Sequence, residues 1–474
     1  MMDRGADPYR AERAPGHSSG EVSGHESDHE SGHEFHHASG YLAGYRHRLG
    51  RLQPWRWRGE VLQSVGQTIE SAGPICSVGQ LCAIVDQTGI RHLAEVIGFR
   101  GKTVLSMPVN APEGIRYGDA VEALGTTPEV EVGSALMGRV LDALGGAIDG
   151  GRRPRTSMAM PLDGPVCTPL DRLPIRRPLG TGIRALDGLL TVGRGQRVGI
   201  FGGSGVGKST LIGMMTRNTE ADVTVVGLVG ERGREVGEFL EDALGEEGRK
   251  RSVVMVSTSD QSPLMRMRAA LGATAVAEYF ASQGKHVLLV LDSLTRFAMA
   301  AREIGLAAGE PTTAKGYTPS VFTRLAKLVE RAGSFRRGSI TAFYTVLMEG
   351  DDQQDPLVDA VRSLLDGHVV LSRSLASEGW YPPIEVLDSV SRLMTAVAEP
   401  EHRESAAVVR RLLAAYARSE DLVRIGAYKA GSDEDLDRAL RARPLLRSFL
   451  AQDAGESVDF AACVERLGDL ADEI

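Results

Sequence analysis

A short apolar stretch that runs into a glycine-rich loop constrains this chain more than any other feature. Residues 196–211 read QRVGIFGGSGVGKSTL, which is a strand, then the pattern G-x-x-x-x-G-K-S/T, then the apolar start of a helix. Glycines let backbone N–H groups converge on phosphate oxygens, and the positive end of the following helix points at the same place. A glycine-rich turn that matches by chance is disfavoured because both flanks fit. The stretch therefore predicts a nucleotide-binding core.

The residues of this loop have separate expected roles. Lys208 is expected to reach the β- and γ-phosphates, and the hydroxyl of Ser209 is expected to ligate Mg²⁺. The backbone around them is expected to wrap the phosphates. The nucleotide-binding residues predicted in this way are Gly202, Gly203, Ser204, Gly205, Val206, Gly207, Lys208, Ser209 and Thr210.

The length and composition of the chain indicate several soluble domains. A chain of 474 residues is long enough for about three domains of roughly 100–200 residues. Apolar residues make up 42%, and no run approaches the roughly 18 apolar residues of a membrane span. The net charge of −8 disfavours a general nucleic-acid binder, which needs a basic surface. A peripheral contact with a membrane stays open.

The cysteines indicate a reducing compartment. They are scattered, without the paired spacing of a zinc site, and no secretory signal sequence precedes them. We therefore expect reduced thiols and a cytoplasmic protein. The four are Cys76, Cys82, Cys167 and Cys463.

Residues 1–44 differ in composition from the rest of the chain. They are rich in Ser, Gly, His and Glu, and they contain almost no aliphatic residues. Such a segment cannot bury enough apolar surface to offset its ordering entropy, so we expect it to be disordered. Residues 33–37 fit the zinc-protease pattern H-E-x-x-H, but the flanking Ser and Gly offer no helix to align the imidazoles. Adventitious metal binding by a flexible His tract is the favoured alternative.

Residues 45–58 form a short basic segment. They read YRHRLGRLQPWRWR, with five arginines, no acid, and two of the three tryptophans of the chain. Arginine with interfacial aromatic residues suits an anionic membrane surface or an acidic partner. A solvated basic edge that leads into the next domain explains the same residues about equally well.

The next region is expected to form a small β-barrel followed by a connector. Short β-type runs separated by Gly, Pro and Asn turns extend to about residue 149, which gives a domain over residues 45–150 that includes the basic segment. Six prolines then fall between residues 154 and 178, so no helix or central strand is expected, and residues 151–178 are predicted to be an extended connector. The runs assigned to the barrel read EVLQSVG, QLCAIV, HLAEVIGF, KTVLSMPV, DAVEAL and ALMGRVLDAL.

Residues 179–394 alternate apolar strands with helical stretches. This pattern predicts a parallel sheet covered by helices on both faces, with a nucleotide at the carboxyl ends of the strands. Residues 395–474 are β-poor and rich in alanine, leucine and charged residues, so we predict a C-terminal helical bundle. The chain is thus predicted to be a multidomain α/β protein. The expected strands of the sheet cover residues 197–201, 223–229, 252–257, 286–291, 340–347 and 368–371.

Two carboxylates at strand ends are candidates for the chemistry. The apolar strand of residues 286–291 is followed by Asp292, a candidate to hold Mg²⁺ and its waters, although many buried strands end in Asp. Glu231 follows the strand of residues 223–229 at the same edge of the sheet and is the candidate general base. A solvated charged turn, GERGRE, is the alternative interpretation of Glu231.

A series of motifs follows the proline connector in a fixed order. They are GGSGVGKST, VGERGREV, VLLVLDSLTRFAMAAREI, GSITAFYTVLMEGDDQQDP, DGHVVLSRSLASEGWYPPIEVLDSVSR and LVRIGAYKAGSDEDLDRAL. In this order they resemble the protein-export ATPases of the flagellum and of type III secretion, which are homologues of the catalytic subunit of rotary ATP synthases. The resemblance covers roughly residues 55–474. It implies a RecA-like P-loop core that hydrolyses ATP with Mg²⁺ to energise protein unfolding, chaperone release and export.

The resemblance also assigns roles to individual residues. It makes Glu231 the catalytic carboxylate, Arg232 a neighbour on the γ-phosphate side and Asp292 the acid on the Mg²⁺ side. Tyr381 would stack on adenine. Arg392 matches the arginine finger, which reaches into the site of the neighbouring subunit and acts only in an assembled ring. Without the resemblance, a surface salt bridge would be the preferred interpretation of Arg392.

Partners and location follow from the same resemblance. It implies a homohexamer, a central-stalk protein, a regulatory stator-like export protein and export chaperone–substrate complexes, at the cytoplasmic face of the inner membrane. An ATPase of the virulence-type injectisome is the close alternative, and a rotary synthase subunit is less favoured because its acidic D-E-L-S-E-E-D loop is absent. A hexameric RNA translocase would need basic, aromatic loops that the barrel region lacks. A non-enzymatic nucleotide sensor would be expected to have lost part of the site.

Overall fold

The computed structural model describes residues 57–156, 158–164, 168–348 and 355–474. The predicted disorder of residues 1–44 and the metal affinity near residues 33–37 lie outside the described residues, as does most of the basic segment of residues 45–58. These statements remain predictions. The described elements that position the site are the central sheet and the helices packed on it.

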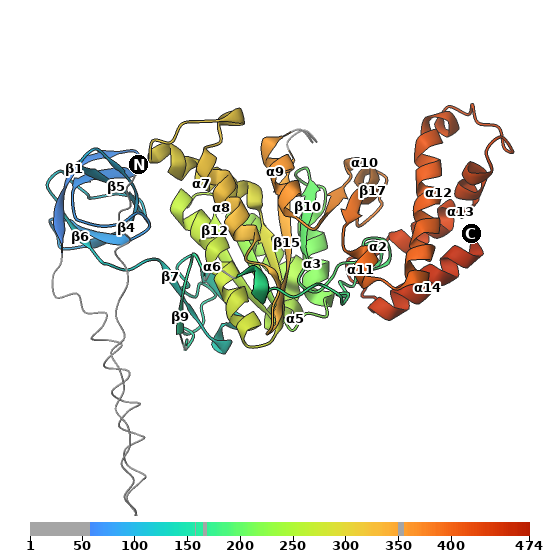
Figure 1. The fold of residues 1–474 in the computed structure, drawn as a ribbon, viewed down its shortest axis with the longest axis horizontal. Helices are drawn as coiled ribbons and strands as arrows, with labels where there is room; N and C mark the ends of the chain where they lie inside the picture. Colours follow the sequence, from blue (N-terminus) through green and yellow to red (C-terminus); the bar gives the residue numbers. More distant parts are fainter. Residues whose placement is uncertain (1–56, 157, 165–167, 349–354) are drawn as a thin grey trace, which may run out of the picture. The chain divides into compact units, whose positions relative to one another are not determined.

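Six antiparallel strands close into the predicted barrel, drawn in blue in Figure 1. Its interior is apolar and includes Val61, Ile69 and Ile84. No strand at β2 is predicted from the sequence. Only a two-residue turn separates β2 from β1, so the sequence shows no clear boundary between the two strands. The strands are β1 (Arg58–Val65), β2 (Thr68–Ala72), β3 (Leu81–Val85), β4 (Arg91–Arg100), β5 (Thr103–Pro108) and β6 (Ala120–Ala123), in the order β1-β2-β5-β4-β3-β6.

The last run assigned to the barrel does not belong to it. Residues 135–144 contribute instead to the 3₁₀ turn η1 (Ser134–Leu136) and to the strand β8 (Val140–Asp142). β8 pairs in parallel with β12 (Ser252–Thr258) at the edge of the central sheet. The prediction that this run lies in the barrel is therefore wrong. A three-residue apolar strand carries no local signal of which sheet it joins.

The described part of the proline-rich connector contains one strand. β9 (Met158–Pro161) pairs with β7 (Glu129–Val132) in a separate two-stranded antiparallel sheet, so this strand is not part of the central sheet. Pro161 lies at the end of the ladder, opposite Glu129, where its missing N–H interrupts no interior hydrogen bond. A 3₁₀ turn, η2 (Pro169–Asp171), follows in the described part of the connector.

The central sheet contains all six predicted strands. Val287 and Leu289 of the strand β13 lie in one core, whereas Leu288 and Val290 lie in the other, so successive side chains are buried on opposite faces. Along the sheet the order is β17-β16-β10-β15-β13-β11-β12-β8. The predicted strands are β10 (Arg197–Gly202), β11 (Val223–Glu231), β12, β13 (His286–Asp292), β15 (Ser339–Leu347) and β16 (Gly367–Leu371), and the short β14 (Gly333–Ser334) pairs with β15.

An antiparallel strand that was not predicted, β17 (Ile384–Ser391), occupies one edge of this sheet next to β16. Polar residues interrupt its apolar ones, with Ile384 and Val386 buried and Asp388 exposed. Such alternation is typical of an edge strand that is covered on one face only. The expectation of an entirely parallel sheet is therefore corrected at this edge.

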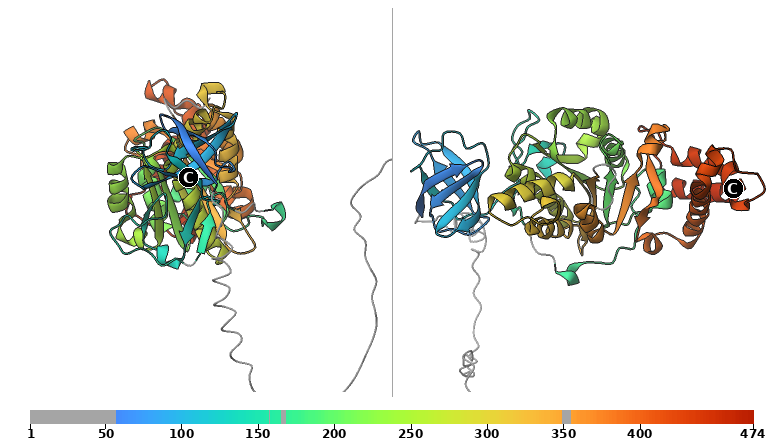
Figure 2. Two further views of the ribbon diagram at one scale, coloured as in Figure 1. Left: turned by 90° about the vertical axis from the view of Figure 1, so that its left-hand side faces the viewer. Right: turned by 90° about the horizontal axis from the view of Figure 1, so that it is seen from above.

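Helices cover both faces of the sheet, as Figures 1 and 2 show. One face carries α6 (Pro263–Ser282), α7 (Leu294–Ala307), α8 (Pro319–Val329) and α9 (Pro356–Leu364). The other carries α2 (Arg184–Leu189), α3 (Lys208–Asn218), α4 (Gly233–Glu238), the π-helical segment η3 (Phe239–Leu244) and α5 (Gly245–Lys250). The contact between α3 and η3 needs a glycine, because a Cβ at Gly213 would lie 2.5 Å from the carbonyl oxygen of Ala243.

The carboxyl end of the chain is helical, as predicted. α12 (Pro400–Arg424), α13 (Glu434–Leu450) and α14 (Phe460–Glu473) pack against one another and against α2 (Figures 1 and 2). Leu446, Phe449 and Leu467 share their core with Leu186 and Leu189 of α2. The short elements η4 (Ala314–Gly316), α10 (Arg373–Ser377) and α11 (Met394–Val397) complete the described structure. None of the described helices combines the length and the apolarity that a membrane crossing requires.

Candidate active site

The carboxyl ends of four neighbouring strands bring the predicted residues together. β10 leads into the phosphate loop, and β15, β13 and β11 follow it across the sheet in that order. Asp292 is the last residue of β13, and Glu231 is the last residue of β11. Because these strands are parallel, both carboxylates lie at the same edge of the sheet as the loop.

The phosphate loop depends on glycines in left-handed backbone. Gly205 has a φ of 76° and Gly207 a φ of 100°, conformations that glycine adopts without strain. Gly207 directly precedes Lys208, the first residue of α3, so the loop ends where the positive end of the helix dipole lies. The exposed side chains at this point are those of Ser204, Ser209 and Thr210.

The ammonium group of Lys208 is buried beneath the loop. Its Nζ donates hydrogen bonds to the carbonyl oxygen of Gly202, at 3.0 Å, and to that of Gly203. Burial lowers the pKa of Lys208, while the nearby carboxylates of Asp292 and Glu231 oppose this shift. The side chain thus lies between the loop and both acids, where a cation can meet phosphate oxygens.

Asp292 and Ser209 line the same cavity of about 260 Å³. The hydroxyl of Thr345, in β15, donates a hydrogen bond of 2.5 Å to Oδ1 of Asp292. Burial raises the pKa of Asp292, and this hydrogen bond and Lys208 lower it. Mg²⁺ is commonly bound by one or two protein oxygens together with phosphates and waters, so the hydroxyl and the carboxylate here fit such an ion.

Glu231 lines the same cavity as Ser209 and Asp292. Its side chain is only 18% exposed. Burial, and then the charge of Asp292, raises the pKa of Glu231 to about 8, and a hydrogen bond with the side chain of Glu235 acts in the same direction. A carboxylate that binds and releases a proton near neutral pH can act as a general base.

Arg296 is a site residue that the sequence analysis does not contain. It lies in the first turn of α7, four residues after Asp292, and its Nε is 4.0 Å from Oε1 of Glu231. This nitrogen is buried and has no hydrogen-bond partner in the structure. The sequence offers one signal for Arg296. It lies in the helix that follows the strand ending in Asp292, and that helix starts at the carboxyl edge of the sheet.

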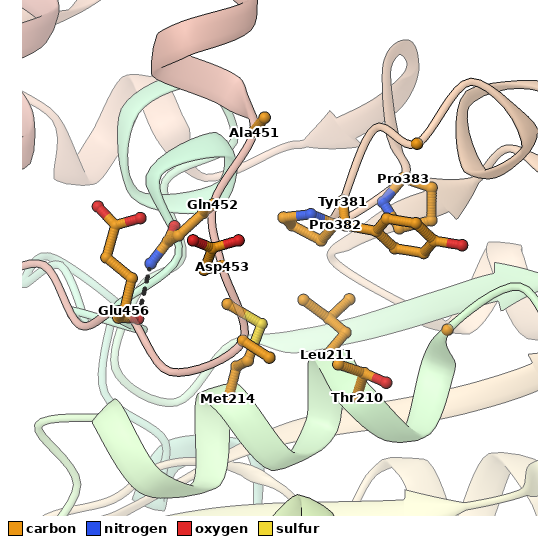
Figure 3. A pocket seen from close by; sticks show the side chains of 13 residues that line it. Thr210, Leu211, Met214, Tyr381, Pro382, Pro383, Ala451, Gln452, Asp453 and Glu456 are labelled. Carbon is orange, nitrogen blue, oxygen red and sulfur yellow. Dashed lines mark hydrogen bonds between the residues drawn. The ribbon is translucent and has the colours of Figure 1, made fainter.

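A second cavity, of about 470 Å³, adjoins the phosphate loop (Figure 3). The ring of Tyr381, which is 49% exposed, stands on one side with two prolines, as the resemblance implies for an adenine pocket. Thr210, Leu211 and Met214 of α3 form its floor. The opposite wall is residues 451–456, between α13 and α14, which the sequence analysis does not assign to the site. A short loop without a motif offers no sequence signal of this role.

Two predicted arginines line neither cavity. Arg232 precedes α4, is 76% exposed, and has its guanidinium 3.8 Å from Glu235. Arg392 follows β17 and is exposed, and its backbone N–H donates to the carbonyl oxygen of Asp366. Roles at the phosphates for these two residues therefore stay predictions.

Comparison with known proteins places the chain in a family. Residues 182–391 match the family model of the ATP synthase alpha/beta family, nucleotide-binding domain. Residues 398–469 match that of the T3SS EscN ATPase C-terminal domain. The flagellum-specific ATP synthase of Pseudomonas aeruginosa is 53% identical, over 87% of this chain and 92% of the relative. The chain belongs to the family of flagellar and type III secretion ATPases.

Other members of the secretion ATPase family agree with this assignment. The flagellum-specific ATP synthase of Treponema pallidum is 54% identical, over 90% of this chain and 96% of the relative. The assembled ATPase EscN from the type III secretion system of enteropathogenic E. coli is 42% identical, with a TM-score of 0.83 over 87% of this chain and all of that chain. EscN in complex with its central stalk EscO has a TM-score of 0.80 over the same shares. The chain is an ATP-hydrolysing enzyme of this family.

The burial of Glu231 predicts a pH-dependent stability. The pKa of Glu231 lies near 8 in the folded protein, above its ordinary value of 4.5, so the folded state holds more protons than the unfolded state between these values. Stability should fall as the pH rises through this window, and Glu231→Gln, which cannot ionise, should escape the loss. In thermal unfolding, we expect Glu231→Gln to match the wild type below about pH 5 and to exceed it at pH 8 by about 1 kcal/mol or more.

The matched control is Glu303→Gln in α7, where the carboxylate is 47% exposed and pairs with Arg266. This variant should not gain stability relative to the wild type as the pH rises. A gain for Glu231→Gln that stays constant from pH 5 to pH 8 would contradict the raised pKa.

Proposed function

We propose that this chain hydrolyses ATP with Mg²⁺ to energise the unfolding, chaperone release and export of proteins through the flagellar type III secretion apparatus. The observation that carries the proposal is the convergence of Ser209, Glu231 and Asp292 on one cavity beside Lys208. The match of residues 398–469 favours a secretion ATPase over a rotary synthase. Identities of 53–54% to two flagellar relatives, against 46–48% to two type 3 secretion system ATPases and 42% to EscN, favour the flagellar system over the injectisome.

Each residue of the site has one task in this proposal. Lys208 meets the β- and γ-phosphates, and Ser209 and Asp292 hold Mg²⁺, which when bound neutralises charge on the phosphate oxygens. Glu231 accepts the proton of the attacking water, a task that its raised pKa suits. Tyr381 stacks on adenine. The exposed Arg232 contributes from the γ-phosphate side.

The proposal includes a homohexamer around a central-stalk protein. Arg392 is exposed and lies away from both cavities of its own chain, which suits a cation that acts on a neighbouring subunit. A planar guanidinium inserted there would stabilise charge on the transferred phosphoryl group. EscN, a solved relative, is known as an assembled ATPase and in complex with its central stalk EscO, which supports the same arrangement for this chain.

The proposal also includes a location and further partners. We place the protein in the cytoplasm at the inner membrane, where it meets a regulatory stator-like export protein and export chaperone–substrate complexes. The basic segment of residues 45–58 is the proposed contact with anionic lipid or with an acidic partner. Nucleic acid is not a proposed partner, because the net charge is −8.

Two substitutions in the site test hydrolysis. Lys208→Ala should weaken ATP binding, because the ammonium meets the phosphates before the reaction. Glu231→Gln should leave ATP bound and lower kcat by about 100-fold or more, the order expected for losing a positioned general base. Phosphate release and equilibrium ATP binding measure the two effects, with the surface variant Lys250→Ala as control. Turnover by Glu231→Gln close to that of the wild type would remove the assigned role.

Mixing two inactive variants tests the ring. Arg392→Ala chains and Glu231→Gln chains should each have little activity alone. Their mixture should regain some turnover, because some interfaces then combine an intact Glu231 with an intact Arg392. Specific activity of the wild type should also rise with protein concentration. A monomer at every concentration by light scattering, with constant specific activity, would contradict the ring.

Two truncations test the basic segment. Binding to anionic vesicles should survive removal of residues 1–44 and be lost on removal of residues 1–56. The second truncation stops before Arg58, because Arg58 begins β1 and its guanidinium lies 2.6 Å from Glu122 in the barrel. Co-sedimentation measures binding, which should fall steeply with salt because screening acts over about 8 Å at physiological ionic strength. Equal binding by both truncations would show that the segment is only a solvated edge.

A further inference from the structure

One wall of the base pocket comes from a loop that has no regular structure of its own. Residues 451–456 connect α13 to α14, and Gln452, Asp453 and Glu456 lie on the side of the pocket opposite Tyr381 (Figure 3). Such a loop fixes the width of a pocket only if other parts of the protein hold it in place. The residue that does so is Arg184, the first residue of α2.

The guanidinium of Arg184 holds this loop at two points and the end of α13 at a third. The residue is only 3% exposed. Its Nε donates to the carbonyl oxygen of Phe449 at 2.6 Å, and its Nη2 donates to that of Ala451 at 2.5 Å. Its Nη1 forms an ion pair with the carboxylate of Glu456. Because the donors of a guanidinium lie in one rigid plane, these contacts fix the orientation of the loop as well as its position.

Gln452 completes the attachment and joins the two walls. Its side-chain Oε1 accepts from the backbone N–H of Arg184 at 2.9 Å, and its Nε2 donates to the carbonyl oxygen of Gly182 at 2.7 Å. Its backbone N–H donates to the carbonyl oxygen of Tyr381 at 2.7 Å. The loop is thus bonded to the residue whose ring forms the opposite wall.

The ion pair also changes the charge that a nucleotide meets. Glu456 lines the pocket on the wall opposite Tyr381, and its carboxylate would repel an anionic ligand if it had no partner. Arg184 neutralises it from behind, since Arg184 itself does not line the pocket. The arginine therefore affects the nucleotide site through geometry and through charge without touching the ligand.

We propose that Arg184 is a positioning residue for the nucleotide base: it holds residues 451–456 at a fixed distance from Tyr381 and so sets nucleotide affinity and base preference. The inference rests on the proposed ATPase function. A purely structural role for Arg184 would have a different effect on nucleotide binding. An arginine that only fastened the helical carboxyl end to the core would affect stability and leave nucleotide affinity and base preference unchanged.

The test compares Arg184→Ala and Arg184→Lys in the full chain. For Arg184→Ala we expect the KM for ATP to rise by about 10-fold, the order of a lost charged hydrogen bond, with kcat changed by less than about 3-fold. The ratio of kcat/KM for ATP to that for GTP should change as well, because the wall that meets the base has moved. Arg184→Lys keeps the charge but not the planar contacts, so it should restore part of the affinity.

Two further variants keep the test decisive. Arg194→Ala is the matched control, because Arg194 also contacts a carbonyl oxygen, that of Pro178, and a carboxylate, that of Glu220, but not the loop. It should leave KM and the ATP-to-GTP ratio unchanged. If Arg184→Ala does not fold, Glu456→Gln removes the ion pair at a side chain that is 38% exposed, and base preference should again change.

A binding measurement separates this inference from the proposed hydrolysis. In a Glu231→Gln background, the Kd for ATP should rise by about 10-fold on adding Arg184→Ala. A rise in Kd supports the inference even if the wild type fails to hydrolyse ATP, which would count against the proposed function alone. A lowered melting temperature with unchanged Kd and unchanged base preference would overturn the inference.

Discussion

The carboxyl edge of the central sheet is built around two carboxylates held close together and away from water. Burial raises the pKa of both Asp292 and Glu231, and the charge of Asp292 raises that of Glu231 further. Lys208 and the Thr345 hydroxyl oppose this at Asp292. Such a cluster costs folding free energy, so it needs a rigid frame. The sheet supplies that frame, because its strands are apolar on both faces and helices cover each face.

The order of the strands decides which groups can meet. β15 separates the strand of the phosphate loop from the strand of Asp292, so Thr345 lies next to the acid it restrains. Glu231 is one strand farther along and lines the same cavity as Ser209. Thr345, Asp292 and Glu231 thus lie on three neighbouring strands, and their backbones are held by the hydrogen bonds of the sheet. This makes the spacing between loop and acids a property of the whole sheet.

Sequence predicts the parts of this site that have a local signal. The phosphate loop has a motif with two correct flanks, and Asp292 and Glu231 each end a long apolar strand. Arg296 has only the weaker signal of its place in the helix after Asp292, because its role depends on the distance between α7 and β11, which only the fold determines. Residues 451–456 enter the site from a helical region far along the chain. Contacts of this kind are set by packing, and no spacing rule reveals them.

The errors in the predicted strand arrangement have a similar origin. β17 has the alternation of any half-buried strand, and its apolar and polar residues give no indication of which neighbour it joins. The strand β8 is shorter still, and only β7 and η1 separate it from the last barrel strand in the chain. Its partner β12 lies more than a hundred residues later. Local patterns can predict that a segment is extended, but the pairing requires the tertiary fold.

The place of β8 has a consequence for how the chain divides. The chain leaves the barrel, adds an edge strand to the central sheet, and only then enters the connector and the P-loop region. A fragment that begins at residue 151 would therefore lack part of its own sheet. β12 would become an uncovered edge, with the unpaired N–H and C=O groups that favour pairing between molecules. Part of the core sheet thus lies in the chain before the connector, so the smallest self-contained core begins before Val140.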